Sequence, residues 1–341
     1  MTNTSPGSPR QPAPIINGLA LGLSLQDIVE PMADGGVTAC NWTVAAPGIL
    51  TPNDLAGVIR LLARVRGALK ADASKARLIS TAEDIRRCAS DGVPGIILGF
   101  QDPAAIEQSP ELIELFHALG VRVIQIAYQR QGSLGSGSGE PSDGGLSDFG
   151  VQCIGLMNEL GILVDLSHVG PRTTLDAIDA SAQPCAFTHT AVSAITAHPR
   201  TKSDEAIRRL AARGGVVGVI GVSAYLRPDG NAGTTVDDIV RQVAYIADLV
   251  GIDHVGIGLD IVEGMTEDFW DKRVIPSFAD LPGLETPDPF RFETYYPAGL
   301  RSMGNMGLIA EALAAHRLSD ADVRKVMGGN FLRLFEEVWA A

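Results

Sequence analysis

The sequence of 341 residues predicts an α/β fold, a single (β/α)8 barrel of the TIM type with extra helices at its C-terminal end. Eight short apolar runs rich in β-branched residues alternate with segments of helical periodicity. The runs are apolar throughout, as parallel strands covered on both faces are. The turn after the first run, NGLALG (17–22), lacks the G-x-G-x-x-G pattern of a doubly wound nucleotide-binding sheet, so that fold is the second choice.

The predicted strands are spread along the chain from residue 14. They span residues 14–19, 36–44, 95–100, 122–127, 161–166, 184–188, 214–220 and 254–259. Helical periodicity is clearest over 104–119, 149–160, 172–180, 204–212 and 236–250, and in the first of these Ile106, Leu112, Leu115 and Leu119 share one face. Two closing helices are expected near 308–315 and 320–339. We therefore expect one barrel domain over residues 14–341.

The composition of the chain limits its partners and its compartment. It carries 27 Lys and Arg against 40 Asp and Glu, a net charge of -13, and no basic cluster that would bind nucleic acid. No apolar run approaches the ~18 residues of a membrane helix. Residues 1–13 are polar and Pro-rich without the apolar core of a signal peptide, which predicts a disordered leader on a cytoplasmic protein. The four cysteines are too widely spaced for a zinc knuckle or a disulfide framework.

Two segments depart from the alternation of strands and helices. Residues 129–147 are dense in Gly and Ser and lack the Gly-Lys-Ser/Thr ending of a phosphate-binding loop, so we expect a mobile loop over the end of the fourth strand. Residues 264–300, an insertion after the eighth strand, carry many aromatic residues among several prolines. This composition suits a lid over the barrel, the arm of a homodimer or an ordinary packed insertion.

Polar side chains follow several predicted strands at their carboxyl ends, where barrel enzymes place their reacting groups. Gln101 follows the third strand, Tyr128 the fourth, His168 the fifth, His189 the sixth and Asp260 the eighth. Two neutral imidazoles and a carboxylate are a common set of zinc ligands. The sequence therefore predicts that this end of the barrel holds one metal ion or performs acid–base chemistry on a small molecule.

Two further residues complete the predicted site. Arg200 lies eleven residues after His189, within reach of the barrel mouth, and a guanidinium can bind a carboxylate through two parallel hydrogen bonds. Glu140 lies in the Gly/Ser loop, from which it can act as an acid or base if the loop closes over the site. From the residues alone, a solvated surface arginine is the favoured interpretation of Arg200, and a substrate that carries a carboxylate is the alternative.

Four segments, in this order and spacing, resemble the membrane (renal) dipeptidase family of metallopeptidases: VDLSHVG (164–170), FTHTAVSAITAHPR (187–200), DHVGIGLD (253–260) and VMGGNFLRLF (326–335). The resemblance covers nearly the whole chain after residue 14. It implies a metal-dependent barrel that hydrolyses dipeptides with two bridged zinc ions. It also implies that His168 and His189 ligate one zinc, that Arg200 binds the substrate carboxylate, and that Asp260 acts at the metal centre.

The sequence departs from this family at the other zinc. The family's Asp-Gly-His-x-Asp segment corresponds to NGLAL (17–21), in which leucines replace both ligands. Gln101 stands in place of the bridging glutamate, and Tyr128 in place of a histidine that assists the transition state. A neutral amide supplies no charge to offset the repulsion between two cations, and leucine cannot ligate. We therefore expect at most one bound zinc ion.

Three functions are compatible with these residues. The preferred one is a dipeptidase-like hydrolase that acts on a small carboxylate-bearing amide or dipeptide through at most one zinc ion. The second is a metal-independent lyase, isomerase or epimerase that uses the two histidines, Asp260, Tyr128 and Glu140 for proton transfer. The third is a catalytically silent barrel that only binds a ligand or partner. The ordered set of polar residues at the strand ends argues against this third function.

Overall fold

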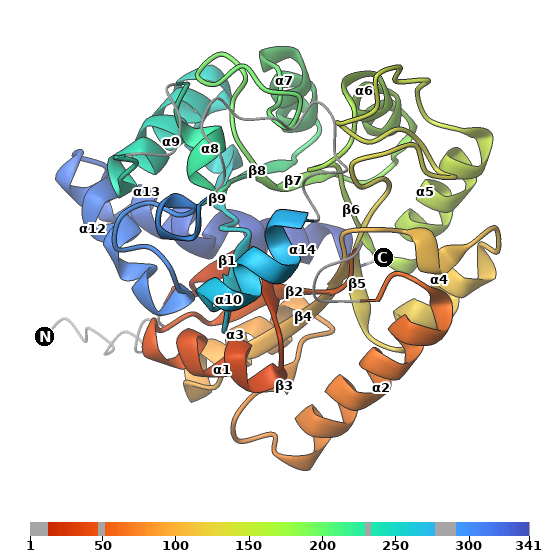
Figure 1. The fold of residues 1–341 in the computed structure, drawn as a ribbon, viewed down its shortest axis with the longest axis horizontal. Helices are drawn as coiled ribbons and strands as arrows, with labels where there is room; N and C mark the ends of the chain where they lie inside the picture. Colours follow the sequence, from red (N-terminus) through yellow and green to blue (C-terminus); the bar gives the residue numbers. More distant parts are fainter. Residues whose placement is uncertain (1–12, 47–51, 229–232, 277–290, 341) are drawn as a thin grey trace, which may run out of the picture.

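All eight predicted strands are present in the computed structural model, which describes residues 13–46, 52–228, 233–276 and 291–340. They run parallel in one curled sheet, and helices pack around it (Figure 1). Their side chains are almost all buried because the barrel interior covers one face and the helices cover the other. The strands are β1 (Ile16–Gly22), β2 (Ala39–Ala45), β4 (Gly95–Phe100), β5 (Val121–Gln125), β6 (Leu163–Asp165), β7 (Ala186–Thr190), β8 (Val216–Val219) and β9 (Val255–Ile257).

Helices connect the strands and begin at the residues expected to cap them. The principal ones are α1 (Leu25–Asp34), α2 (Leu55–Ala71), α3 (Ala82–Asp91), α4 (Glu111–Ala118), α5 (Asp148–Leu160), α6 (Pro171–Ala180), α7 (Asp204–Ala212) and α9 (Val236–Val250). Ser147 and Ser203 accept hydrogen bonds from the first turns of α5 and α7, and Pro171 opens α6. The five predicted helical segments correspond to α4, α5, α6, α7 and α9, with a 3-10 turn before α4.

The barrel closes through a strand that is divided in two. After β9 ends at Ile257, three residues intervene before β10 (Ile261–Glu263), which pairs in parallel with β1. The other part of the divided strand, β9, pairs with β8. The eighth predicted strand therefore supplies only the first of the two short strands that complete the ring. A short strand that the sequence did not indicate, β3 (Arg77–Leu78), pairs with the start of β4.

Asp260 lies in the break between β9 and β10. Its φ of 53° falls in the left-handed region, which aspartate adopts more readily than most residues. The Asp260 N–H donates to Leu19 O (3.1 Å), and the Leu259 N–H donates to the side-chain oxygen of Asn17 (2.8 Å). These two hydrogen bonds tie β1 to the break and hold Asp260 at the carboxyl end of the strands.

The opposite end of the barrel is plugged by the C-terminal helices. α12 (Gly307–Ala315) and α13 (Asp320–Arg324) lead to α14 (Asn330–Val338), whose Phe331 is fully buried. Gly18, Gly218 and Gly256 make room for the Phe331 ring, since a Cβ on any of them would lie within 3.1 Å of it. Packing density in protein interiors leaves no slack for such a clash, so these glycines are required for the plug.

The Gly/Ser loop over residues 129–147 is anchored along its length. The Ser136 N–H donates to Thr173 Oγ1 (3.1 Å), and the Asp143 carboxylate accepts from the N–H groups of Arg172 and Thr173 at the start of α6 (2.7 and 3.0 Å). Leu134 and Ser136 are fully buried. The loop is therefore a packed part of the barrel rim.

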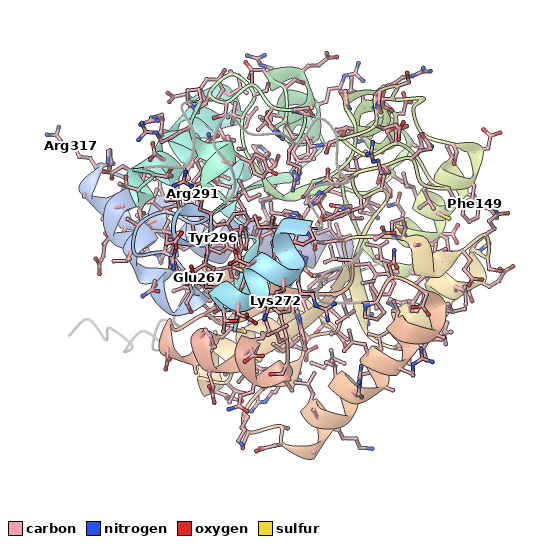
Figure 2. The ribbon with its side chains drawn as sticks, viewed as in Figure 1. Phe149, Glu267, Lys272, Arg291, Tyr296 and Arg317 are labelled. Carbon is pink, nitrogen blue, oxygen red and sulfur yellow. The ribbon has the colours of Figure 1, made fainter. Side chains whose placement is uncertain are left out.

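The described part of the insertion after the eighth strand, residues 264–276 and 291–300, lies at the mouth of the barrel. α10 (Glu267–Phe269) and the wide turn Trp270–Val274 run in front of the strands (Figure 1), and Figure 2 labels Glu267 and Lys272 on this segment. Residues 277–290 of the insertion, and the predicted leader apart from Ala13, fall outside the described residues. Within the described ranges, no helix has both the length and the apolarity to cross a membrane.

Glu263, the last residue of β10, is a buried carboxyl group. It is 4% exposed, and its Oε1 accepts from the Met303 N–H (2.6 Å) and the Ser302 hydroxyl (3.2 Å). Burial raises the pKa of Glu263 from 4.5 to about 7. Because the folded chain binds this proton more tightly than the unfolded chain, its contribution to stability is complete below pH 4.5 and is lost as the pH rises through 7.

Replacing Glu263 with glutamine is expected to stabilise the protein at pH 8 by roughly 2–3 kcal/mol and to change little at pH 5. The amide keeps the accepting oxygen and removes the buried charge. Chemical denaturation at both pH values measures the effect, with the exposed Glu267→Gln as the matched control. A gain that is equal at pH 5 and pH 8 would show that charge burial at Glu263 is not its source.

Candidate active site

Four polar side chains converge at the carboxyl end of the strands. Gln101 follows β4, His168 follows β6, His189 lies in β7, and Asp260 lies between β9 and β10. The Nε2 atoms of His168 and His189 are 2.9 Å apart, and the Gln101 Nε2 atom lies 3.4 and 3.2 Å from them. One ligand atom from each histidine and from Asp260 fall within 4.8 Å of one another. The structure thus brings together side chains that are up to 159 positions apart in the sequence.

Both histidines are neutral at physiological pH. Burial, followed by the positive charge of Arg200, lowers the pKa of His168 and of His189 well below 6.5. A neutral imidazole has a lone pair on one ring nitrogen, which can bind a metal ion or accept a proton. The site therefore offers two nitrogen donors.

Asp260 supplies the carboxylate of the site. Burial raises its pKa to about 6, and the Arg200 guanidinium opposes this rise. At pH 7 the carboxylate form therefore predominates, and it can accept a proton. Asp260 is half-buried, whereas His168 and His189 are almost completely enclosed, so Asp260 is the more open of the three to the pocket.

Arg200 is a buried cation beside these groups. Its side chain is 1% exposed, and its two terminal nitrogens donate to Ser167 O (2.5 Å) and His189 O (2.9 Å). These bonds fix the plane of the guanidinium. A guanidinium has five N–H donors, so others can bind an anion in the pocket that Arg200 lines together with His168 and Asp260.

Tyr128 stacks on His168, with ring centres 4.3 Å apart. Burial raises the pKa of Tyr128 well above its ordinary value of 10, so the phenol stays protonated at neutral pH. A protonated phenol in a pocket of low polarity can donate a hydrogen bond to a developing oxyanion. The position of Tyr128 at the pocket wall agrees with this role.

Tyr128→Phe is expected to lower kcat roughly 10²-fold with little change in KM, because the lost hydrogen bond would form mainly in the transition state. Steady-state kinetics measure both constants. Tyr245→Phe is the matched control, since the Tyr245 hydroxyl donates to the surface carboxylate of Asp204. An unchanged kcat in Tyr128→Phe would make Tyr128 a packing residue.

Aromatic and apolar side chains form the walls of the pocket. They come from β1, α8 (Ser223–Leu226), β10 and the insertion: Leu21, Tyr225, Val262, Trp270, Val274 and Tyr295. The Trp270 and Tyr295 rings are 4.5 Å apart. The free volume of the pocket is about 50 Å³, so the pocket is narrow between these walls. Sequence reasoning did not assign these residues to the site, although the aromatic cluster in the insertion was a signal for them.

Glu140 lies away from these residues. It lines a separate hollow with Asp143 and Lys202. Its Oε2 accepts from the Gln131 N–H (3.0 Å) within the Gly/Ser loop. Because this loop is packed against α6, the structure does not bring Glu140 to His168, His189 and Asp260, and we assign it no part in the chemistry.

Leucines occupy the two positions that the resemblance aligns with ligands of a second zinc ion. Leu19 is buried in the barrel, Leu21 lines the pocket, and Asn17 bonds to the Leu259 N–H at the closing strand. Among the described residues, one group of potential metal ligands is found, His168, His189 and Asp260.

The chemistry of this group fits a single divalent ion such as zinc. Two imidazole nitrogens and a carboxylate oxygen are typical zinc ligands. In a metal-bound histidine, the ring nitrogen that does not bind the metal usually has a hydrogen-bond partner. In His189 this nitrogen, Nδ1, lies 2.8 Å from the Thr188 hydroxyl. The corresponding nitrogen of His168, Nδ1, is buried and has no hydrogen-bond partner among the described residues. The two histidines therefore differ in the hydrogen bond that would orient each of them as a metal ligand.

Comparisons with known proteins agree with this geometry. A family model described as membrane dipeptidase (peptidase family M19) matches residues 21–278. A Schizosaccharomyces pombe protein described as an uncharacterized dipeptidase is 33% identical over 189 residues, 54% of this chain and 45% of that protein. The dipeptidase tcpJ of Claviceps purpurea is 27% identical over 259 residues, 75% of this chain and 54% of its own length. The chain thus spans about half the length of these two relatives.

A solved structure extends the similarity over the whole fold. An amidohydrolase from Pseudomonas aeruginosa is 32% identical to this chain, with a TM-score of 0.86, and the match covers 96% of this chain and 97% of that one. The family model covers more than half of the chain and includes the strand ends that carry Gln101, His168, His189 and Asp260. The chain belongs to the membrane dipeptidase family.

Proposed function

We propose that the protein hydrolyses an amide bond in a small carboxylate-bearing molecule, a dipeptide or a related amide, with at most one divalent ion at the site. One observation carries this proposal: the buried cation of Arg200 lines the same pocket as His168 and Asp260, with His189 in contact with His168. An anchor for an anion thus lies beside a set of metal ligands and a proton acceptor. Membership of the dipeptidase family supports the choice of hydrolysis.

Each residue has a role that follows from its position. Arg200 binds the substrate carboxylate and so sets the orientation of the amide. Asp260 accepts a proton from the attacking water and can return it to the leaving amine. Tyr128 donates to the oxygen of the tetrahedral intermediate. The aromatic walls exclude water, which strengthens each of these polar interactions.

His168, His189 and Asp260 would hold the ion. When bound there, zinc supplies Lewis-acid polarisation of the scissile carbonyl and lowers the pKa of a nearby water. Gln101 lies against both histidines, and its Oε1 is buried with no partner among the described residues. A rotated amide would offer this oxygen to the same centre as a neutral ligand.

Metal-independent acid–base chemistry is the second candidate, and a specific observation favours it. The contact between the two histidine Nε2 atoms at 2.9 Å is satisfied by one shared proton, without an ion. His168 would then carry its proton on Nε2, and its unpartnered Nδ1 would hold only a lone pair. In this case the site would transfer protons in a lyase, isomerase or epimerase.

Metal analysis combined with isotope labelling distinguishes these functions. For protein purified without added zinc and dialysed, we expect no more than one divalent ion per chain. With a panel of dipeptides and N-acyl amino acids in H₂¹⁸O, we expect one product to gain solvent ¹⁸O. Two ions per chain would contradict the assigned ligands. Exchange of a substrate C–H for deuterium without ¹⁸O would favour the second candidate, and neither label across the panel would favour a binding protein.

A further inference from the structure

Asp165, the last residue of β6, is a buried carboxylate that none of the roles proposed above uses. It is 1% exposed. Its Oδ1 accepts from the N–H and the hydroxyl of Ser167 (3.0 and 2.5 Å) and from the Thr188 N–H (3.1 Å). Its Oδ2 accepts from the Thr188 hydroxyl (2.6 Å). A charge at this depth is costly unless it is fully hydrogen-bonded, and these four donors meet that need.

Burial raises the pKa of Asp165, and its hydrogen bonds with Ser167 and Thr188 oppose this rise and favour the ionised form. Two of its donors are backbone N–H groups, which cannot reverse their direction. The buried guanidinium of Arg200 interacts electrostatically with Asp165. An ionised carboxylate only accepts hydrogen bonds, so the Thr188 hydroxyl must donate its single proton to it.

The direction of that proton determines the next hydrogen bond. Thr188 Oγ1 also lies 2.8 Å from the Nδ1 atom of His189. Because its only proton points at Asp165, the hydroxyl can meet His189 only as an acceptor, and the proton between them must belong to Nδ1. A neutral imidazole carries one N–H, so the His189 Nε2 atom has the lone pair. This is the atom that faces His168 and Gln101 at the site.

The backbone of Thr188 is tightly enclosed, which keeps its hydroxyl between Asp165 and His189. Its carbonyl oxygen is surrounded by glycines of three strands or strand ends. A Cβ on Gly18, Gly218 or Gly258 would lie 2.4, 2.1 or 1.8 Å from it. The Thr188 backbone therefore has no room to move, and the hydroxyl keeps its place between Asp165 and His189.

We propose that Asp165, acting through the Thr188 hydroxyl, fixes the tautomer of His189 so that its Nε2 lone pair faces His168 and Gln101. Asp165 and Thr188 are positioning residues, and the inference rests on the proposed role of His189 at the site. The lone pair serves equally as a metal ligand or as a proton acceptor. His168 has no comparable device, since its Nδ1 lacks a partner in the described part of the chain. Of the two histidines, His189 is therefore the one whose tautomer is fixed in the described part of the chain.

Three variants test this relay, the chain of hydrogen bonds from Asp165 through the Thr188 hydroxyl to His189. Thr188→Ser keeps the hydroxyl and should leave the tautomer unchanged. Thr188→Val removes the hydroxyl and should abolish the preference for Nδ1–H. Asp165→Asn presents an NH₂ group to Thr188, which reverses the hydroxyl, so His189 should adopt the opposite tautomer with its proton on Nε2. Thr190→Val is the matched control, because it removes a buried hydroxyl of the same strand that donates to the backbone oxygens of Ala191 and Arg200.

Nitrogen NMR of metal-free protein reads the tautomer directly. The chain has six histidines, so ¹⁵N-histidine labelling gives a small set of ring patterns, and His189→Gln identifies the one of interest. We expect His189 of the native chain and of Thr190→Val to carry the proton on Nδ1. A proton on Nε2 in the native chain, or a pattern unchanged in both Thr188→Val and Asp165→Asn, would overturn the inference.

Zinc affinity is the second readout. Titration with zinc against a chromophoric chelator should show a loss of 10- to 100-fold in Asp165→Asn, a smaller loss in Thr188→Val and recovery in Thr188→Ser. Equal losses in Thr188→Ser and Thr188→Val would show that packing, not the hydroxyl, matters, and would also overturn the inference. If no variant and no native protein binds zinc, the zinc part of the proposed function fails, while the NMR result still decides the relay.

Discussion

Replacement of His189 by alanine is expected to remove the bound ion and to lower kcat/KM by roughly 10³-fold, which corresponds to about 4 kcal/mol of lost transition-state stabilisation. The side chain is fully buried, and its Nε2 atom lies 2.9 Å from that of His168. With one nitrogen donor gone, the described site keeps His168, Asp260 and the neutral amide of Gln101. His168→Ala should have the same effect. Elemental analysis and steady-state kinetics of the same preparations measure both losses.

His316→Ala is the control for these variants. His316 is exposed and contacts Asp237 on the surface (3.1 Å), so its loss should change neither metal content nor activity. Circular dichroism confirms that the variants are folded. A His189→Ala protein that keeps both its ion and its activity would show that the ligand assignment is wrong. A graded loss of activity with an altered pH profile and no change in metal would favour metal-independent chemistry.

Asp260→Asn is expected to lower kcat by roughly 10²- to 10⁴-fold while part of the metal stays bound, because an amide cannot accept the proton of the attacking water. Asparagine suits the test because it fills the same volume and tolerates the positive φ of this position. Burial raises the pKa of Asp260 to about 6, and a bound cation would lower it. Protonation removes the acceptor, so the acid limb of kcat/KM in the native enzyme should lie at or below pH 6.

Asp102→Asn is the matched control for Asp260→Asn. Asp102 also follows a strand, β4, but it does not line the pocket, and its side chain accepts from the Ala104 N–H (2.7 Å). Asparagine preserves that acceptor, so kcat should change little. If both variants lose activity equally, the loss reflects the charge at the barrel mouth and not proton transfer by Asp260. If Asp260→Asn keeps full activity, another group accepts the proton.

The strands and most helices follow from the sequence because their signals are local. Eight apolar runs became eight parallel strands, and helical periodicity placed α5, α6, α7 and α9 to within a residue or two. The errors arise where contacts between residues far apart in the sequence determine the local structure. The predicted helix over 320–339 is interrupted by a wide turn at Lys325–Gly329, because the Gly328 backbone packs against Pro14. A Cβ on Gly328 would lie 2.2 Å from the Pro14 oxygen, a contact that no periodicity reveals.

The grouping of the candidate residues could be predicted where a general rule of barrel architecture places them. His168, His189 and Asp260 follow strands, and parallel strands end at the same edge of a barrel. Glu140 has no such constraint, because its loop is held by Asp143 and Thr173, and this anchoring cannot be foreseen from Gly and Ser content. The hydrogen bonds that join Asp165 to His189 through Thr188 were also missed, since they depend on how β6 and β7 lie side by side.

The break in the closing strand has a consequence for protein engineering. Asp260 and the bonds that close the ring occupy the same three-residue break, so a library that randomises residues 258–260 would mostly yield misfolded chains. Leu21 and Val262 are better targets. They are register partners across the β1–β10 pair, and both line the pocket without a side-chain role in closure. Varying this pair together should change substrate preference while the barrel and its polar groups stay intact.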